Sequence, residues 1–504
     1  MNIAAIDVGS NAIRMLLAST DGSGLTPVAS FREPVRLGHD VFMRGRIGED
    51  TMSRAARAIA RLAEIQKQHG VERGRAIATS AVREASNRQA LVERVRRESG
   101  IELEVISGVE EGRLIYLAVK SNLDIGRSNA IIAELGGGSM ELILVKEGRL
   151  EKIETYKIGA VRLLEMLTNG GRGGGVEEAS FSRLVSEYIA GLRGHMQKAT
   201  EGFSADRFIA TGGNVEKIAA LVATSPSDGK PPVVAKDDLR QLIMKLSNLS
   251  YRERIEKLGL DEDRADVILP ASIVVYGVLE ATGMASFVVP MVGLREGIVR
   301  ELASSIEKEP ARLHLHDASV YLGRRYQFDE GHALRVAQNA AFLFERLQPI
   351  HRLESRLVTI LETASVLHDI GFYVNGRQHH KHSYYLIVHS NIPGLSPREK
   401  AIVANIARYH RKSPPKTAHA TLATLDRSDR ETVRKLAAIL RIADALDRDH
   451  AGTVVPAAVQ IEGSVVTLRV RVHGDLTLGQ WAIGRKSGLF KDTFGYEVKA
   501  VEEA

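Results

Sequence analysis

The chain opens with two largely apolar runs separated by a glycine-containing turn. Ile3 to Ile6 and Ile13 to Ala18 are the runs, and Asp7-Val8-Gly9-Ser10-Asn11 lies between them. Apolar runs of this length, bounded by turn residues, predict two buried strands joined by a tight turn. A further apolar run, Ile101 to Ile106, predicts another strand.

Helical periodicity lies between these strands, from Thr51 to His69. Its apolar residues share one face of a helix; they are Met52, Ala55, Ala56, Ile59 and Ala63. Asp50 or Thr51 suits the N-cap, and Gly70 suits the C-terminal end. The first part of the chain therefore predicts alternating strands and helices.

The opening pattern returns in a second block that begins near residue 126. Ala130 to Ala133 predicts a strand, Leu135 to Ser139 a glycine turn, and Glu141 to Val145 a second strand. Both blocks run in the order strand, acid, glycine loop with serine, strand, and the two acids are Asp7 and Glu134. This self-similarity predicts two related α/β domains that face one another.

The pattern changes after about residue 305. From there to about residue 450 the pattern predicts helices and contains many histidines. Val465 to Val472 alternates between apolar and polar residues, which predicts a strand with one solvent-exposed face. We therefore predict α/β domains over 1–125 and 126–305, an all-α domain over 306–452, and a small α/β domain over 453–504.

Composition narrows the class of protein. The 504 residues suffice for several domains. Cysteine is absent, which excludes disulfides and thiolate chemistry and fits a reducing cytoplasm. The apolar runs are too short to span a bilayer, and the start lacks a signal-peptide pattern, so we expect a cytoplasmic protein without a membrane partner. The net charge of +6 fits either a mixed surface or a basic face for a polyanion such as nucleic acid or polyphosphate.

Both glycine turns have the residues that bind phosphate. Glycine lets backbone N–H groups approach an anion, and serine and asparagine add donors; the candidates are Gly9, Ser10, Asn11, Gly136, Gly137, Gly138 and Ser139. Flanking acids would repel phosphate unless a cation lies between, so Asp7, Glu134 and Glu141 are candidate ligands of Mg²⁺. One loop alone fits a plain glycine-rich hairpin better than a phosphate site, whereas two matched loops, each after a strand and an acid, favour phosphate. No Walker-type Gly-Lys-Ser/Thr is present.

These motifs resemble those of the exopolyphosphatase and guanosine pentaphosphate phosphohydrolase family. The resemblance runs in order from residue 3 to about 302 and more loosely beyond. It includes the two glycine turns and the segments 79–85, 106–116, 210–213 and 293–297. The family belongs to the superfamily of actin, sugar kinases and heat-shock chaperone ATPases. The resemblance therefore implies two actin-like (ribonuclease H-like) domains with a cleft between them.

The resemblance also implies roles for single residues. In the family the second acid of the pair Glu110-Glu111 is catalytic, so Glu111 is the expected base, and Arg83 is expected beside the phosphate. A third anion-facing turn corresponds to Thr211, Gly212 and Gly213. From the residues alone, both acids also fit the first turn of a helix, and Arg83 also fits a surface salt bridge with Glu84 or another acid.

One position departs from the family. Aspartate is usual where this chain has Glu134, and glutamate is longer by one methylene. Because Mg²⁺ demands tight octahedral geometry, we expect activity with altered dependence on Mg²⁺ and Mn²⁺.

The histidine-dense region resembles an HD-type metal phosphohydrolase. His332, His368, Asp369 and Asp444 have its order, and His382 and His410 are candidates for a second metal. Alternatively, this region is a degraded HD domain that binds polyanion chains and forms dimer contacts. Its cations suit that role; they are Arg377, His379, His380, Lys381, Arg408, Arg411 and Lys412.

The expected activity is an exopolyphosphatase that hydrolyses terminal phosphate from inorganic polyphosphate. The alternative within the family is guanosine pentaphosphate (pppGpp) 5′-phosphohydrolase, and guanosine tetraphosphate is a related ligand. A non-catalytic polyphosphate-binding regulator and a kinase-like ATPase are the other classes. The resemblance alone implies a homodimer.

Overall fold

The computed structural model describes residues 1–20, 24–168, 178–222, 230–304, 310–390, 392, 394–411, 413–416 and 419–503. Internal contacts divide the chain into two units, Met1–Glu309 and Pro310–Ala504. The predicted boundary between residues 305 and 306 lies outside the described residues. The division into four domains stays a prediction.

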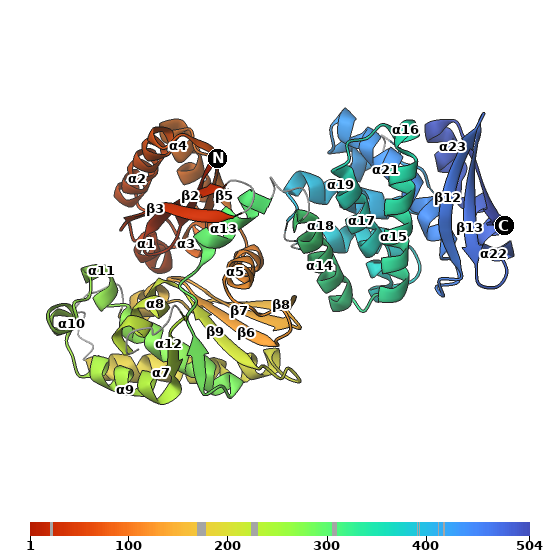
Figure 1. Ribbon diagram of the computed structural model, residues 1–504. Helices are drawn as coiled ribbons and strands as arrows, with labels where there is room; N and C mark the ends of the chain where they lie inside the picture. Colours follow the sequence, from red (N-terminus) through yellow and green to blue (C-terminus); the bar gives the residue numbers. More distant parts are fainter. Residues whose placement is uncertain are drawn as a thin grey trace. The chain divides into compact units, whose positions relative to one another are not determined.

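The first sheet forms at the start of the chain. Its strands are β1 (Asn2–Val8), β2 (Ile13–Thr20), β3 (Leu25–Glu33), β4 (Val71–Ala78) and β5 (Leu103–Val105), in the order β3-β2-β1-β4-β5. Figure 1 labels β2, β3 and β5 of this sheet. β1 is antiparallel to β2 and parallel to β4. The predicted strands are confirmed, and β3 and β4 were not predicted.

The second sheet repeats this topology. Its strands are β6 (Ala130–Leu135), β7 (Met140–Lys146), β8 (Arg149–Tyr156), β9 (Arg207–Thr211), β10 (Val233–Ala235) and β11 (Ser286–Val288), in the order β10-β11-β9-β6-β7-β8. β6 is antiparallel to β7 and parallel to β9, as β1 is to β2 and β4. The repeat in the sequence is therefore a repeat of strand topology.

Helices surround these two sheets. They are α1 (Leu37–Arg44), α2 (Glu49–Gln68), α3 (Ser80–Glu84), α4 (Arg88–Ser99), α5 (Gly108–Asn122), α6 (Ala160–Thr168), α7 (Glu178–Ala199), α8 (Gly213–Val222), α9 (Lys236–Ser247), α10 (Tyr251–Leu258), α11 (Glu262–Ala265), α12 (Ile268–Thr282) and α13 (Leu294–Ser304). The predicted helix is α2. It begins earlier than predicted, after Gly48 and without a side-chain cap, so the prediction of Asp50 or Thr51 as the cap is wrong. Gly70 follows its end with a φ of 59°, as predicted.

One apolar core joins the two sheets. It contains Ile3 of β1, Ile132 of β6, Ile115 of α5 and Ile298 of α13. α5 and α13 approach closely, because a Cβ built on Gly297 would lie 2.0 Å from the Leu114 carbonyl oxygen. The helix that carries Glu111 therefore lies in the core that both sheets share.

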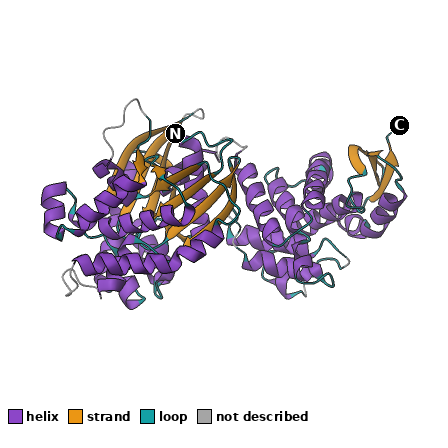
Figure 2. Cartoon of the chain, turned by 90° about the horizontal axis from the view of Figure 1, so that it is seen from below, coloured by secondary structure: helices purple, strands orange, loops and turns teal. Residues whose placement is uncertain are grey.

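The second unit is helical and ends in a small sheet. Its helices are α14 (Pro310–Arg325), α15 (Glu330–Arg346), α16 (Gln348–His351), α17 (Leu357–Leu367), the 3₁₀ turn η1 (Ile370–Tyr373), α18 (His379–His389), α19 (Pro397–Arg408), α20 (Ala420–Ala423), α21 (Arg427–Leu446), α22 (Thr477–Lys486) and α23 (Gly488–Phe494). Its strands are β12 (Val454–Glu462), β13 (Val465–Val472) and β14 (Glu497–Glu502), in that order in the sheet. Figure 2 shows this small sheet near the C-terminus. β13 confirms the predicted alternating strand.

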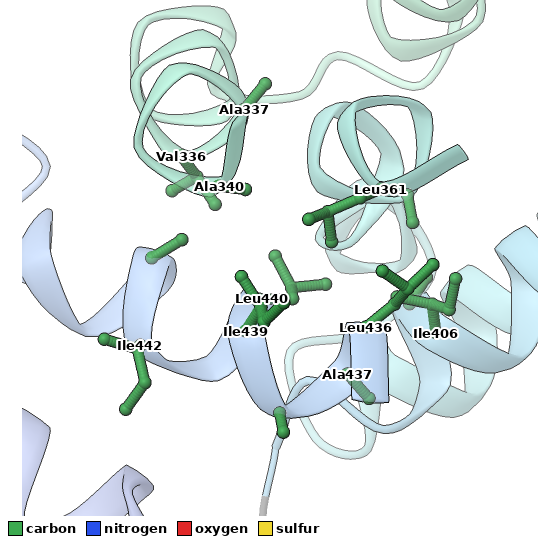
Figure 3. Packing of buried hydrophobic residues seen from close by; sticks show 14 of the residues in the cluster. Val336, Ala337, Ala340, Leu361, Ile406, Leu436, Ala437, Ile439, Leu440 and Ile442 are labelled. Carbon is green, nitrogen blue, oxygen red and sulfur yellow. The ribbon is translucent and has the colours of Figure 1, made fainter. Parts of the chain in front are cut away.

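The core of this unit lies between its helices. Leu440 of α21, Val336 of α15 and Leu361 of α17 are fully buried in one cluster (Figure 3). Among the described residues, no helix is both long and apolar enough to cross a membrane.

Candidate active site

The two glycine turns lie against one another in the first unit. A Cβ built on Gly138 would lie 2.7 Å from Ser10 Oγ, and one built on Gly137 would lie 3.0 Å from Ser10 Cβ. Each turn closes with the same bond across three residues. Gly9 N–H donates to the Ala12 carbonyl (3.2 Å), and Gly136 N–H donates to the Ser139 carbonyl (3.1 Å).

The start of α6 fixes the direction of the second turn. Ala160 and Val161 N–H groups donate to the carbonyls of Gly136 (3.2 Å) and Gly137 (2.9 Å), and Arg162 Nε donates to the Gly138 carbonyl (2.7 Å). In a trans peptide the C=O and the N–H point in opposite directions. The N–H groups that follow these three carbonyls therefore point away from α6.

The first turn is held in the same way. The Gly38 N–H donates to the Ser10 carbonyl (2.8 Å), and the Arg36 N–H donates to the Asn11 carbonyl (2.9 Å). The side-chain amide of Asn11 donates to the Asp263 carbonyl oxygen (3.1 Å). Asn11 therefore contributes its backbone to the turn while its side-chain amide is already hydrogen-bonded.

A cleft with about 850 Å³ of space, including open solvent, lies at these turns. It is lined by most of the predicted site residues: Asp7, Gly9, Ser10, Asn11, Glu111, Glu134, Gly136, Gly137, Gly138, Ser139, Gly212 and Gly213. Thr211, Glu141 and Arg83 are not among the lining residues. Gly212 has a φ of 117°, and a Cβ there would lie 2.5 Å from the Leu135 carbonyl oxygen, so only glycine fits this close approach.

Carboxylates converge at one end of the cleft. Glu111, Glu134 and Glu141 each offer an oxygen within 4.8 Å of the others. Glu134 and Glu141 are directly opposed on β6 and β7. Burial, reinforced by mutual repulsion, raises the pKa of Glu111 to about 7 and that of Glu134 to about 8. Burial also raises the pKa of Asp7 above its usual range.

These carboxylates fit a divalent cation. Asp7 Oδ1 and Glu134 Oε2 are buried oxygens without a hydrogen-bond partner, which is costly unless another positive group contacts them. All the donor atoms are carboxylate oxygens, which hard cations such as Mg²⁺ prefer.

The structure separates the two neighbouring acids at the start of α5. Glu110 pairs with Arg113, whose Nε and Nη2 donate to its carboxylate at 2.9 and 2.8 Å. Glu111 instead lines the cleft and is 5 % exposed. Ser107 caps the helix by accepting from the Glu110 N–H (3.2 Å). Both acids are thus first-turn residues, and only Glu111 lines the cleft.

Arg83 contacts Glu111. Its Nη1 lies 3.2 Å from Glu111 Oε2 and donates to the Ile106 carbonyl at 2.8 Å. Its positive charge lowers the pKa of Glu111, against the dominant effect of burial. The acid that pairs with Arg83 is therefore the buried candidate base Glu111, and not a surface acid.

Three arginines of the cleft were not predicted: Arg14, Arg264 and Arg295. Arg14 stands opposite Asp7 in the β1–β2 hairpin, and a Cβ on Gly213 would lie 2.4 Å from its Nη2. Arg14 could have been predicted from the hairpin, because its register places Arg14 directly opposite Asp7. Five carboxylates and three guanidinium groups line the cleft, so an anion there requires additional positive charge.

Most of the predicted histidines and acids of the second unit meet in a separate cluster. His332, His368 and Asp369 form one potential metal-binding group, and Asp369, His379 and His410 form another. Asp444 Oδ1 lies 3.8 Å from His332 Nε2. Among the described residues, His379 takes the place predicted for His382, because His379 begins α18 at the cluster. Lys412 lies outside the described residues.

Comparisons with known proteins agree with this fold. Residues 16–306 match the Ppx/GppA phosphatase family, and residues 317–478 match domain III of Ppx/GppA phosphatase. Together with the paired sheets, these matches define the class of protein as a phosphoanhydride hydrolase. The chain belongs to the Ppx/GppA phosphatase family.

Two relatives extend the comparison over nearly the whole chain. It is 27 % identical over 470 residues to the guanosine-5′-triphosphate,3′-diphosphate pyrophosphatases of Aeromonas hydrophila and Aeromonas salmonicida, covering 92 % of this chain and 91 % of each relative.

Solved structures cover about three-fifths of the chain. The Aquifex aeolicus member of the Ppx/GppA family is 27 % identical and covers 62 % of this chain and 99 % of its own, with a TM-score of 0.52. An exopolyphosphatase from Cytophaga hutchinsonii shares the fold with a TM-score of 0.56 at 24 % identity, covering 60 % of this chain and 98 % of its own.

Proposed function

We propose that the chain is a guanosine pentaphosphate 5′-phosphohydrolase that releases the terminal phosphate of guanosine-5′-triphosphate,3′-diphosphate. One observation carries this choice. The Aeromonas guanosine-5′-triphosphate,3′-diphosphate pyrophosphatases align with 92 % of this chain, through both units. The exopolyphosphatase of solved structure aligns with 60 % and supports the fold alone. The comparisons thus favour the alternative over the exopolyphosphatase expected from the sequence.

The two turns hold the terminal phosphoryl group in this proposal. The N–H groups that follow the carbonyls bound by α6 and Arg162 donate to its oxygens, as do those of the first turn. Gly212 and Gly213 line the same cleft and add a third backbone surface. Phosphoryl transfer needs positioning and charge neutralisation more than covalent help, and these turns supply positioning.

Glu111 orients and deprotonates the attacking water. The water oxygen bonds to the terminal phosphorus, the bond from that phosphorus to the bridging oxygen breaks, and orthophosphate leaves. A pKa of about 7 suits a general base at neutral pH, and Arg83 holds the Glu111 carboxylate in place.

Asp7, Glu134 and Glu141 would hold Mg²⁺ or Mn²⁺ in this proposal. When bound, the cation would neutralise negative charge on the phosphoryl oxygens. Support comes from the orphaned Asp7 and Glu134 oxygens and from the excess of carboxylates over guanidinium groups in the cleft.

Polyphosphate is the second candidate substrate. The exopolyphosphatase-like protein of solved structure, 27 % identical with a TM-score of 0.53, favours it. Both substrates present the same terminal phosphoanhydride, so the residues of the cleft do not separate them. Phosphate release from pppGpp, long polyphosphate and ATP, measured side by side on the full chain, does. We expect the highest kcat/KM for pppGpp, and a higher value for polyphosphate would refute this choice.

The role of Glu111 is tested with a matched pair of variants. Glu111→Gln should lower kcat by about 10²- to 10⁴-fold, the usual contribution of a general base. Glu110→Gln makes the same change one residue away and should lower the melting temperature, because it breaks the pair with Arg113, while kcat stays within a few-fold. Equal turnover in the wild type and Glu111→Gln would remove Glu111 from the mechanism.

A homodimer in the cytoplasm completes the proposal. The resemblance supports the dimer, and the absence of cysteine supports a reducing compartment. Sedimentation of the full chain at several concentrations tests the dimer, and a single monomeric species would contradict it.

A further inference from the structure

We propose that the second unit contains a dinuclear metal centre, bridged by Asp369, that hydrolyses phosphate esters of nucleotides. This activity is separate from phosphoanhydride hydrolysis in the first unit. It rests on residues of the second unit alone.

Asp369 faces two different sets of histidines. Its Oδ2 lies 3.5 Å from His368 Nε2. Its Oδ1 lies 3.2 Å from His379 Nε2 and 3.4 Å from His410 Nε2. One carboxylate thus offers one oxygen to each set, which is the arrangement of a bridging ligand between two metal ions.

The first set is completed from two other helices. His332 of α15 lies within 4.8 Å of His368 and Asp369 through ligand atoms. Asp444 of α21 brings its Oδ1 to 3.8 Å from His332 Nε2. The second set is Asp369, His379 and His410.

The imidazole rings are oriented for metal binding. Nδ1 of His368 lies 2.6 Å from the Ser365 carbonyl, and Nδ1 of His410 lies 2.6 Å from the Ala407 carbonyl. A carbonyl only accepts, so each Nδ1 carries a proton. The lone pair of each neutral ring is therefore on Nε2, the atom that faces Asp369. Such outer hydrogen bonds are typical of histidine ligands.

His332 is held in the same way by an acid. Its Nδ1 lies 2.7 Å from Asp447 Oδ2, and Asp447 also accepts from Arg335 Nε at 2.9 Å. Nε2 of His332 and Nε2 of His368 are buried and have no hydrogen-bond partner. Burying these nitrogens without a partner costs free energy, so an ion-pair network that only stabilised the fold would not explain them. A metal ion would bind both nitrogens.

The ligands limit the metal. Imidazole nitrogens with carboxylate oxygens suit Mn²⁺, Fe²⁺, Co²⁺ or Zn²⁺ better than Mg²⁺. The first unit differs, because its candidate ligands are all carboxylates.

A cavity beside this centre has the chemistry of a nucleotide site. It surrounds about 1240 Å³ of space, including open solvent, and Asp369, His379, His410 and Asp444 line it. Arg411, Arg448 and Arg485 line it as well, which favours an anion.

Two aromatic rings complete its wall. Phe372 and Trp481 line the cavity and are 53 % and 54 % exposed. Phe372 stacks on the His379 ring with centroids 4.0 Å apart, and Arg485 lies over the Trp481 ring at 5.4 Å. Exposed rings beside cations and metal ligands fit a planar base that carries phosphate.

The reaction is a hydrolysis without redox change. A water oxygen bonds to phosphorus, and the bond from phosphorus to the sugar oxygen breaks. The sugar oxygen takes a proton and leaves as a hydroxyl, and orthophosphate is released.

Manganese binding by the full chain tests the metal centre. We expect the wild type to bind two more Mn²⁺ ions than Asp369→Asn and one more than His410→Ala, by elemental analysis after dialysis. Any Mn²⁺ bound in the first unit contributes equally to the wild type and the variants, so it drops out of the difference in Mn²⁺ content. The wild type should also give the electron paramagnetic resonance spectrum of coupled Mn²⁺ ions. His382→Ala, a histidine of the same helix as His379, is the control and should bind as the wild type does.

Hydrolysis is then measured with the first site disabled. Full-length Glu111→Gln protein loaded with Mn²⁺ should release phosphate from 5′- or 3′-guanosine monophosphate, and adding Asp369→Asn should abolish the release. Circular dichroism verifies that each variant is folded, and His410→Ala replaces Asp369→Asn if the latter is not. Equal Mn²⁺ content in the wild type and both cluster variants would overturn the metal centre. Metal binding without release from either nucleotide would overturn the esterase.

Discussion

Replacing Arg83 by glutamine should shift the pH dependence of catalysis. Burial is the main reason that the pKa of Glu111 is raised to about 7, and Arg83 opposes it by favouring the charged carboxylate. Without the guanidinium the pKa of Glu111 should rise further. A general base is active above its pKa and loses activity as the pH falls through it, so the acid limb of the profile should move to higher pH.

The contact suggests the size of this change. Arg83 Nη1 lies 3.2 Å from Glu111 Oε2, and Glu111 is 5 % exposed. A hydrogen bond to a charged group contributes about 1.5–3 kcal/mol. Since about 1.4 kcal/mol corresponds to one pH unit, the acid limb should move by about one to two pH units. At pH 7 the ionised fraction of Glu111 would fall from one half to between about one tenth and one hundredth, so the variant should be roughly five- to fiftyfold slower.

The assay is kcat/KM for phosphate release from pppGpp between pH 5 and pH 9 at fixed metal concentration. A bound cation lowers the pH midpoint of the acid limb in the wild type and in the variant alike. The quantity compared is therefore the difference between their two midpoints. Arg83→Lys keeps the charge and should move the limb less than Arg83→Gln. If Arg83→Gln lowers the rate equally at every pH, Glu111 is not the group that titrates, and the reasoning fails.

Three further predictions concern the metal, the third turn and the second core. Glu134→Asp shortens one candidate ligand, so its Mg²⁺ and Mn²⁺ activation curves should differ from those of the wild type; superimposable curves would count against Glu134 as a ligand. Gly212→Ala forces a Cβ against the Leu135 carbonyl at a φ of 117°, and it should lower both kcat/KM, by about tenfold, and the melting temperature, with strain of about 1–3 kcal/mol. Wild-type values of both would contradict the tight fit. Leu440→Ala leaves a cavity in a fully buried core and should lower the free energy of unfolding by about 2–5 kcal/mol. Calorimetry measures this loss, and a transition unchanged from the wild type would contradict it.

Strand topology was the part of the fold most open to prediction. β1, β2, β6 and β7 are short apolar runs bounded by turns, and that signal is local to the sequence. β3 was missed because only partly buried and exposed side chains lie along it, so its sequence lacks an apolar run. The start of α2 was misplaced because Gly48 precedes it without a side-chain cap.

Turn residues of the candidate site were predictable for a similar reason. Gly9 and Ser10 are adjacent, as are Gly136 to Ser139, and the same glycine-and-serine turn occurs twice after a strand and an acid, which can be read directly from the sequence. The partner of Arg83 was not predictable. Glu84 is its neighbour in sequence, whereas Glu111 of α5 contacts Arg83 of α3 only through the tertiary fold. Contacts of this kind depend on packing between elements, which no local pattern encodes.

The choice between His379 and His382 illustrates the same limit within one helix. Both lie in α18, three residues apart, and both are separated from Asp369 by a similar stretch of chain. Their helical spacing puts them near one face, yet Asp369 contacts His379 and not His382. The reason lies in η1, since a Cβ on Gly371 would lie 2.1 Å from the His379 carbonyl oxygen. That close approach presses the first turn of α18 onto the segment that carries Asp369, so the absence of a side chain at Gly371 selects which histidine joins the cluster.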